Sequence, residues 1–250
     1  IRYSSDALSA DFLAIPFFTP DIVPSAERFS FVNPLSGVPI RGETEPGTTL
    51  SNTELALRLY RRLAGLDASL HVYRGFWRTP AVRLDDPVSP ARGTRFVPEL
   101  SVYAASAQRG LLGGVLSLEA GYYDSRQDSR GDDPAVPDSQ WRLLAGYQRQ
   151  PWEDFTIGVQ GYVEVLERVR GIVSLRLTRW LDYQTWKLSL FAAYSPTDED
   201  SFFQPVVTCR LTDALSASLG ANVFGGNGQA GYFGPIEKSD NVFATIRFDF

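Results

Sequence analysis

His71 is the only histidine in the chain and the side chain best suited to acid–base chemistry near neutral pH. If it lies on a strand, Ser69 shares its face, because side chains two residues apart point the same way. We place a second hydroxyl, that of Ser101, on the same polar face. Hydrolases activate a nucleophile by setting a serine beside a histidine. No nucleophile-elbow motif accompanies these residues, so we predict that the protein is not an enzyme and keep hydrolysis as an alternative.

The remaining metal-ligating and phosphate-binding residue types form no recognisable motif. Cys209 is the only cysteine, and one cysteine with one histidine cannot supply the ligands of a usual zinc site. The aspartates between residues 124 and 138 lack the glycine and terminal glutamate of an EF-hand, so we predict a solvated loop. Gly225–Gly228 follows a predicted strand but opens no helix, unlike a phosphate-binding loop. The sequence therefore predicts neither a metal nor a cofactor.

Basic side chains recur at intervals inside otherwise apolar stretches, and these are Arg58, Arg62, Arg142, Arg176, Lys187, Arg210 and Arg247. Fewer acids accompany them, namely Glu54, Glu119, Glu164 and Asp11. The whole chain nevertheless has 24 Lys and Arg against 29 Asp and Glu, a formal charge of −5, so the excess acid lies in predicted loops such as 124–138 and 198–200. A net acidic chain is poorly suited to binding nucleic acid through phosphate contacts, and we predict no such partner.

The elements that position these charges are predicted to be strands, because apolar residues recur with a period of two almost throughout. In Asp240–Phe250, for example, Val242, Ile246 and Phe248 share one face, whereas Arg247 lies on the other. With 44% hydrophobic residues in 250, the composition fits one folded unit, residues 1–250, and excludes disorder. We predict about twelve strands, at 7–18, 54–60, 69–73, 100–104, 116–123, 140–148, 155–165, 173–178, 186–194, 203–211, 215–223 and 240–250.

Connections between these strands alternate between short and long. Short ones occur near 64–66, 108–112, 150–154, 182–185 and 212–214, and long ones at 19–49, 79–95, 124–138 and 225–239. Short and long connections therefore lie at opposite ends, and an even strand count places Ile1 and Phe250 at the same end. This pattern is typical of an all-β, antiparallel up-and-down transmembrane β-barrel, with tight periplasmic turns and long extracellular loops.

A soluble sandwich also alternates apolar and polar residues, so the pattern alone leaves that alternative open. Two observations favour a lipid-facing barrel. The polar faces carry too many charged and small residues to form a protein core, which leaves the apolar faces without a partner except lipid. Aromatic side chains gather at strand ends and in turns, where the headgroup levels of a bilayer would lie: Trp77, Tyr122, Trp141, Tyr147, Trp152, Trp180, Trp186, Tyr194 and Phe250.

The last strand, Asn241-Val-Phe-Ala-Thr-Ile-Arg-Phe-Asp-Phe250, resembles the terminal strand of Gram-negative outer-membrane β-barrels. More narrowly, Leu211–Leu215, Gly220–Gly225 and Phe233–Val242 are similar to segments of poorly characterised, porin-like outer-membrane proteins of environmental proteobacteria. This narrow likeness covers about residues 170–250. The broad resemblance implies a bacterial outer-membrane location and recognition of the last strand by the barrel-assembly machinery. Members of the narrower group are longer, which implies strands before Ile1. The connection between Leu166 and Gly171 is unexpectedly tight for the loop side, so we expect a longer native loop there.

If the apolar face meets lipid, the polar face lines a lumen, and we predict that its residues are Arg58, Arg62, His71, Glu119, Arg142, Glu164, Arg176, Lys187, Arg210 and Arg247. Basic residues in a pore wall favour anions. We therefore expect a channel that passes small polar solutes, with a preference for anions. Three alternatives stay open: a lumen plugged by ion pairs between these side chains, a structural barrel that binds a partner in an envelope complex, and an outer-membrane hydrolase that uses His71.

Overall fold

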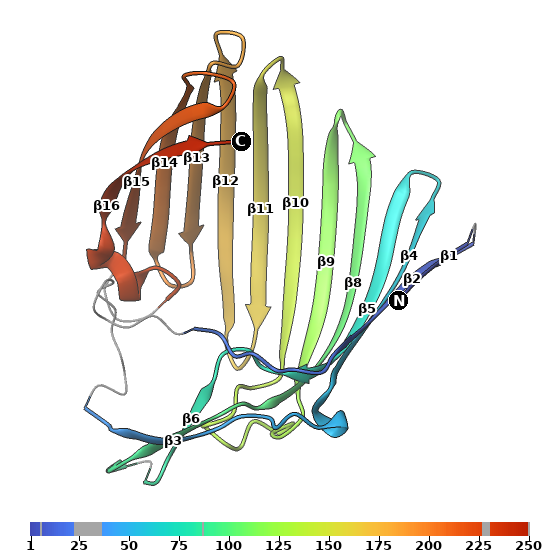
Figure 1. Cartoon of the computed structure of the whole chain (residues 1–250), viewed down its shortest axis with the longest axis vertical. Helices are drawn as coiled ribbons and strands as arrows, with labels where there is room; N and C mark the ends of the chain where they lie inside the picture. Colours follow the sequence, from blue (N-terminus) through green and yellow to red (C-terminus); the bar gives the residue numbers. More distant parts are fainter. Residues whose placement is uncertain (6, 23–36, 87, 227–230, 250) are drawn as a thin grey trace.

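The computed structural model describes residues 1–5, 7–22, 37–86, 88–226 and 231–249, and within them a large curved antiparallel sheet dominates (Figure 1). Neighbours in this sheet follow the chain order, so it runs up and down as predicted. Its strands are β1 (Arg2–Ser4), β2 (Ser9–Ile15), β4 (Glu54–Leu63), β5 (Leu66–Phe76), β8 (Glu99–Leu111), β9 (Gly114–Ser125), β10 (Gln140–Trp152), β11 (Phe155–Val165), β12 (Val169–Leu181), β13 (Trp186–Ser195), β14 (Asp200–Arg210), β15 (Leu215–Gly225) and β16 (Asn241–Phe248). The twelve predicted strands correspond to β2, β4, β5 and β8–β16.

Tight turns gather at one end of the large sheet, as the sequence predicts. The two-residue turns Ala64-Gly65 and Leu112-Gly113 have positive φ at both positions (48° and 79°, 50° and 75°). A two-residue turn of this kind twists in the same sense as the strands it joins, and glycine adopts positive φ without steric cost. We call this end of the sheet the turn end and the opposite end, which carries the long connections, the loop end.

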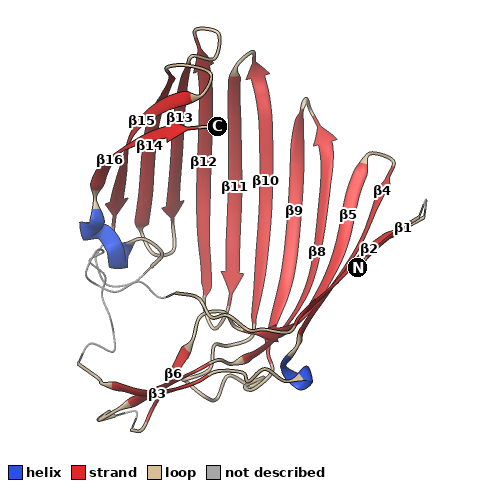
Figure 2. Cartoon of the chain, viewed as in Figure 1, coloured by secondary structure: helices blue, strands red, loops and turns tan. Residues whose placement is uncertain are grey.

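A second, three-stranded sheet lies at the loop end, built from segments that the sequence pattern assigned to irregular loops (Figure 2). It contains β3 (Ile40–Thr44), β6 (Ala81–Leu84) and β7 (Gly93–Phe96), and β3 pairs with β7 in parallel. These strands come from the 19–49 and 79–95 connections and are too short to show a clear period. The described helices are two 3-10 turns, η1 (Leu50–Asn52) and η2 (Gly234–Ser239). In the described part of the chain, no helix is long and apolar enough to cross a membrane.

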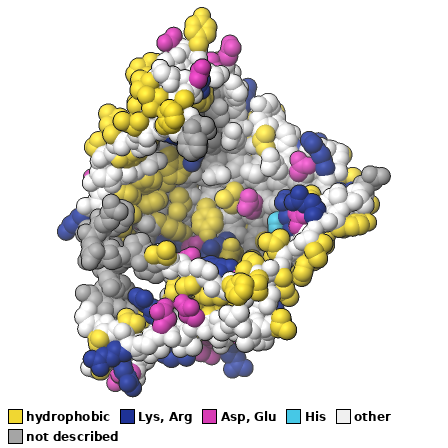
Figure 3. Space-filling model, in the orientation of Figure 1, with side chains coloured by type: hydrophobic (Ala, Val, Ile, Leu, Met, Phe, Trp, Pro, Cys, Tyr) yellow, Lys and Arg dark blue, Asp and Glu magenta, His cyan; other side chains and the backbone are white. Residues whose placement is uncertain are grey.

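The strand register divides the side chains of the large sheet between two faces, because residues paired across antiparallel strands point the same way. We call the face that carries His71 the inner face; it lies in the hollow of the curved sheet, where the histidine sits among cationic and acidic groups (Figure 3). On the opposite, outer face the aliphatic rows are open to the surroundings, with Leu70 59%, Leu219 59% and Ile246 78% exposed. The aliphatic rows therefore do not form a central core.

The buried apolar residues instead cluster toward the loop end, where Phe76, Val97, Leu100 and Val136 are all less than 9% exposed. This corrects the sequence pattern in β8, which predicts Leu100, Val102 and Ala104 on the apolar face and Ser101 and Tyr103 on the polar face. Leu100 pairs with Gly75 and lies on the inner side, whereas Tyr103 is 51% exposed on the outer face. The alternation predicted the wrong face for these residues because loops cover the inner face at the loop end. An apolar side chain that points inward there is buried in a local core and does not face lipid.

The two edges of the large sheet are formed by β1 and β16, and no ladder joins them within the described residues. The edge side chains are open: Val242 is 75% and Ile246 78% exposed. At the other edge, the Ile1 amino group donates to the Phe12 carbonyl oxygen at 2.8 Å. The strand count predicted Ile1 at the turn end, but Ile1 lies beside the middle of β2. The difference arises because β1 adds a short thirteenth strand to the sheet.

Candidate functional site

Charged residues from distant parts of the sequence lie along one row of paired positions across the inner face, which Ala104 and Gly121 interrupt on β8 and β9. The pairings run Arg2–Asp11–Arg58–His71–Ala104–Gly121–Arg142–Glu164–Arg170, from β1 to β12. We call this set the polar row. It passes through a hollow of about 500 Å³ whose lining includes Arg58, His71, Glu119, Arg142 and Tyr162. Of the residues predicted to line a lumen, the following therefore come together: Arg58, His71, Glu119, Arg142 and Glu164.

Several members of the polar row are paired with one another. Arg2 Nε lies 2.6 Å from Asp11 Oδ1. Arg142 Nε lies 3.7 Å from Glu164 Oε1, and its guanidinium stands 4.2 Å from the centroid of the Tyr123 ring. The Tyr162 hydroxyl also donates to Glu164, at 2.6 Å. These contacts hold the long side chains against the wall, so this part of the inner face is a set of fixed charges.

Ser69 and His71 are in hydrogen-bond contact, with 2.8 Å between Ser69 Oγ and His71 Nε2. Ser69 Oγ also lies 2.7 Å from Ser106 Oγ, and Ser69 is only 6% exposed. Ser101, expected on the same face, pairs with Arg74 and lies on the outer one. The backbone around Ser69 is paired with β4 and β8, which leaves its N–H groups poorly placed to stabilise an oxyanion. The arrangement fits a hydrogen-bonded wall residue better than a nucleophile.

A buried carboxylate fastens the loop end to the sheet. Glu54, at the start of β4, is fully buried; Arg78 Nη2 lies 2.5 Å from its Oε2, and the Tyr73 hydroxyl donates to its Oε1 at 2.6 Å. Arg78 also donates to the Thr19 carbonyl at 3.0 Å and stands 5.1 Å from the Phe18 ring. These contacts hold the segment that follows β2, at Phe18 and Thr19, against the loop end of the sheet. Sequence reasoning placed Glu54 on the inner wall but did not identify Arg78, because its loop has no periodic pattern.

A second buried carboxylate, Asp200 on β14, holds η2 against the inner face. The backbone N–H groups of Phe233 and Gly234 donate to its Oδ2 at 2.7 and 3.0 Å. Phe233 packs 5.7 Å from Phe202, which stacks 4.8 Å from Phe224. The inner face here is therefore aromatic, contrary to the polar face that the sequence pattern predicts along β14 and β15.

Tyr232, two residues before η2, connects this helical turn to the polar row. Its hydroxyl donates to Glu164 Oε2 at 3.2 Å, and the Arg170 guanidinium stands 4.1 Å from its ring. Burial raises the pKa of Tyr232 to about 12, and the adjacent Glu164 carboxylate adds to the effect. The phenol consequently remains a neutral hydrogen-bond donor over the physiological pH range.

Four of the predicted wall cations have no carboxylate within ion-pair distance among the described residues: Arg58, Arg176, Lys187 and Arg210. Three of them face aromatic rings instead. Arg176 stands 5.1 Å from the Phe191 ring, Lys187 Nζ 5.3 Å from the Trp180 ring, and Arg58 4.6 Å from the Tyr60 ring. The other three predicted cations are paired: Arg142 with Glu164, as described above, Arg62 with Asp67 at 3.4 Å and Arg247 with Asp249 at 2.8 Å. All of these strand residues lie on the inner face by register.

The predicted aromatic residues divide between the two faces. The register places six of them on the outer face: Tyr122, Trp141 and Tyr194 toward the loop end, and Tyr147, Trp152 and Trp186 toward the turn end. Trp77 and Trp180 differ from the prediction. Trp77 donates from Nε1 to Ser125 Oγ at 3.3 Å and stacks on Tyr123, an inner-face residue, and Trp180 pairs with Lys187 on the inner face. Phe250 lies outside the described residues.

The acidic 124–138 segment is a loop organised around Asp128. Its carboxylate accepts hydrogen bonds from the backbone N–H groups of Gly131, Asp132 and Asp133, the last at 2.6 Å. These bonds, chiefly the one from Asp133, lower the pKa of Asp128. Among the described residues, no group of three or more His, Cys, Asp and Glu side chains is placed to hold a metal ion. A comparison with protein-family models and with curated proteins found no match to this chain.

Proposed function

We propose that the protein is a bacterial outer-membrane β-barrel channel that passes small polar solutes and prefers anions. Two features support the membrane assignment. Aliphatic side chains stay exposed on the outer face across the whole sheet, although burial of each would contribute about 1.5–3 kcal/mol. Aromatic residues flank this surface at two levels, as in transmembrane barrels.

The height between the two aromatic levels suits a bilayer. Trp141 begins β10 at the loop end and Trp152 ends it at the turn end. At about 3.3 Å per residue the two lie about 36 Å apart along the strand, and a strand tilt of about 40° reduces this to about 28 Å across the membrane. An apolar band of a transmembrane barrel is about 25 Å tall, so the outer face of this sheet has the required dimension.

The proposal requires that the edges formed by β1 and β16 be paired in the membrane. Unpaired backbone N–H and C=O groups in hydrocarbon each cost several kcal/mol, and for this reason sheets cross bilayers as closed barrels. We therefore expect the backbone amides of β16, on the side facing away from β15, to be protected from hydrogen exchange in lipid. Rapid exchange of these amides in folded, lipid-embedded protein would contradict a closed barrel.

The anion preference rests on the four inner cations without a carboxylate partner in the described residues, Arg58, Arg176, Lys187 and Arg210. Their charges are not neutralised by the wall, whereas most inner acids are held by an arginine or by backbone N–H groups. Cations projecting into a lumen attract anions and repel cations.

Planar-bilayer recording under a KCl gradient tests both parts of the proposal. The reversal potential of the wild-type channel should indicate chloride preference. Replacing Arg176, Lys187 and Arg210 by Gln should move it toward cation preference, whereas Arg92→Gln, in an exposed loop pair with Asp85, should leave it unchanged. Cation selectivity of the wild type would refute the anion preference, and the lack of any conductance in correctly inserted protein would refute the channel.

The contact between Ser69 and His71 supports a second candidate, an outer-membrane hydrolase. Under that alternative, purified protein should hydrolyse short-chain esters or phospholipids, and both Ser69→Ala and His71→Ala should abolish turnover. Retention of activity in either variant would exclude this pair as the catalytic centre.

A further inference from the structure

Charged residues on the outer face of the large sheet are segregated by height. In its described strands, the register places Arg61, Arg109, Arg149 and Arg179 on the outer face near the turn end. The other outward charges, Arg74, Glu99 and Asp124, lie near the loop end and include both acids. The turn end of the lipid-facing surface is therefore cationic, and the loop end is not.

The four arginines form a regular band, which we call the arginine belt. They lie on β4, β8, β10 and β12, which alternate with β5, β9 and β11 in the sheet. Each arginine is two strands from the previous one and two residues further toward the turns. With strands about 4.8 Å apart and a rise of about 3.3 Å per residue, successive Cα atoms lie about 12 Å from one another. All four side chains are exposed, and none lies within ion-pair distance of a described carboxylate. Among the residues that the structure describes, Arg179 is the belt arginine with a hydrogen-bond partner, donating to the Glu153 carbonyl oxygen at 3.2 Å.

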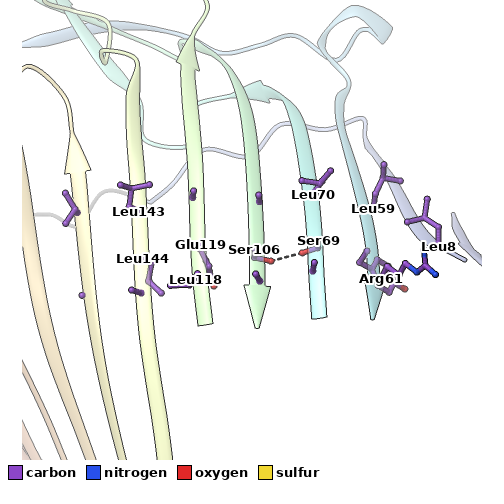
Figure 4. A pocket seen from close by; sticks show the side chains of 18 residues that line it. Leu8, Leu59, Arg61, Ser69, Leu70, Ser106, Leu118, Glu119, Leu143 and Leu144 are labelled. Atoms are coloured by element: carbon purple, nitrogen blue, oxygen red, sulfur yellow. Dashed lines mark hydrogen bonds between the residues drawn. The ribbon is translucent and has the colours of Figure 1, made fainter. Parts of the chain in front are cut away.

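An apolar groove of about 910 Å³ on the same wall has Arg61, one of the four belt arginines, in its lining. Small residues on adjacent strands, Ala105, Ala107, Ala120, Ala145 and Gly161, form its floor, and larger aliphatic side chains stand at its sides. Figure 4 shows Leu59, Leu70 and Leu143 around the groove, with Arg61 and Leu8 at the end nearer the turns. The groove thus joins an apolar trough to a cation, which matches the shape of an amphiphile with an anionic head.

We propose that the arginine belt and this groove bind phospholipids with net negative headgroups, and that the turn end faces the leaflet that contains them. An acyl chain occupies the groove, and the phosphodiester pairs with Arg61, with the other belt arginines contacting neighbouring headgroups. This inference rests on the proposed membrane function, because it requires the outer face to meet lipid.

The chemistry of the belt favours a phosphate headgroup over other occupants. Guanidinium groups bind phosphate through two parallel N–H···O bonds and are less strongly hydrated than ammonium groups, so they suit an interfacial site. Trp152 and Trp186 lie on the outer face toward the same end, as expected at a headgroup level. A second copy of this chain in the same orientation would not complement the belt, because the acids of its outer face, Glu99 and Asp124, lie at the opposite end.

Electron spin resonance of spin-labelled lipids tests the proposal on full-length protein in phosphatidylcholine vesicles. Labelled phosphatidylglycerol should be enriched at the protein surface over labelled phosphatidylcholine by about fivefold, the factor expected for one arginine–headgroup contact. The quadruple variant Arg61→Gln, Arg109→Gln, Arg149→Gln and Arg179→Gln should lose this enrichment. A matched variant, with Arg41, Arg74, Arg92 and Arg95 at the loop end changed to Gln, removes the same charge and should retain it.

Equal enrichment of phosphatidylglycerol in the two quadruple variants would overturn the role of the belt. Added inorganic phosphate at 10-fold excess over lipid should not abolish the wild-type preference; if it does, the belt is a site for free anions. Ala107→Leu fills the groove without altering charge, and it should reduce the immobilised fraction of the lipid label. The channel proposal fails if inserted protein shows no conductance or if the protein does not insert into vesicles. The lipid preference is measured only on inserted protein, so the two proposals can fail independently.

Discussion

Val159 lies near the middle of β11 on the outer face, is 44% exposed, and pairs with Tyr147 and Leu175. If this face meets hydrocarbon, Val159→Arg places a guanidinium near the bilayer midplane. Such substitutions in transmembrane barrels cost about 2–4 kcal/mol. Val169, 58% exposed at the loop-end start of β12, lies near an interface, where the same change costs about 0–1 kcal/mol. The next residue along β11, Gln160, faces inward, so Gln160→Arg should cost little.

Urea unfolding of the three variants in phospholipid vesicles measures these differences. For a slope of about 3 kcal/mol per molar urea, a loss of 2–4 kcal/mol lowers the unfolding midpoint by about 1 M. We expect this shift for Val159→Arg, and at most about 0.3 M for Val169→Arg and Gln160→Arg. The reasoning fails if Val159→Arg and Gln160→Arg shift the midpoint equally, or if wild-type protein folds without detergent or lipid and Val159→Arg leaves its stability unchanged. Either result would mean that water, and not hydrocarbon, covers the outer face.

Three further predictions concern the loop end. Arg78→Met leaves the buried Glu54 carboxylate without its cation and should destabilise the protein by about 3–5 kcal/mol in the same unfolding assay. The control Arg92→Met removes an exposed ion pair with Asp85 and should cost less than about 1 kcal/mol. Alkaline difference spectroscopy should show one phenol fewer titrating near pH 12 in Tyr232→Phe than in wild type. Because folding raises the pKa of Tyr232, its contribution to stability is complete below pH 10 and is lost as the pH rises through 12. Folding lowers the pKa of Asp128, so the stability that its carboxylate contributes is present above about pH 4 and is lost as the pH falls through the lowered pKa. Protease cleavage of the 126–139 loop in wild type should therefore increase over that acidic range. Asp128→Asn, which has no carboxylate to titrate, should show equal cleavage at pH 3 and pH 6.

The strands were predictable because each carries its own signal. A period of two is set by the geometry of an extended chain, so it appears in a single segment before any partner is known. The positions Ala64-Gly65 and Leu112-Gly113 mark turns for a similarly local reason. Prediction failed for β3, β6 and β7, which have five residues or fewer and are stabilised by one another across the two long connections.

The pairing within the inner wall required the register. Sequence alternation places Arg142 and Glu164 on polar faces, but their contact depends on β10 and β11 pairing with residues 142 and 164 opposite each other. Trp180 shows the same limit: its position near a strand end resembles that of a girdle residue, and only the pairing with Lys187 places it on the inner face. The outward arginines were overlooked for a related reason, since Arg109 and Arg149 occupy strand ends where the alternation fades into turns.

The sequence by itself determined that this chain forms antiparallel strands with one aliphatic and one polar face, and that tight turns lie at one end, because alternation and turn preferences depend only on neighbouring residues. Tertiary structure alone decided which charges meet, which aromatic rings face inward, and how Glu54 and Asp200 become buried beneath loops. Those features depend on strand register and on contacts between segments far apart in the chain, and the free energy that selects them is distributed over the whole sheet.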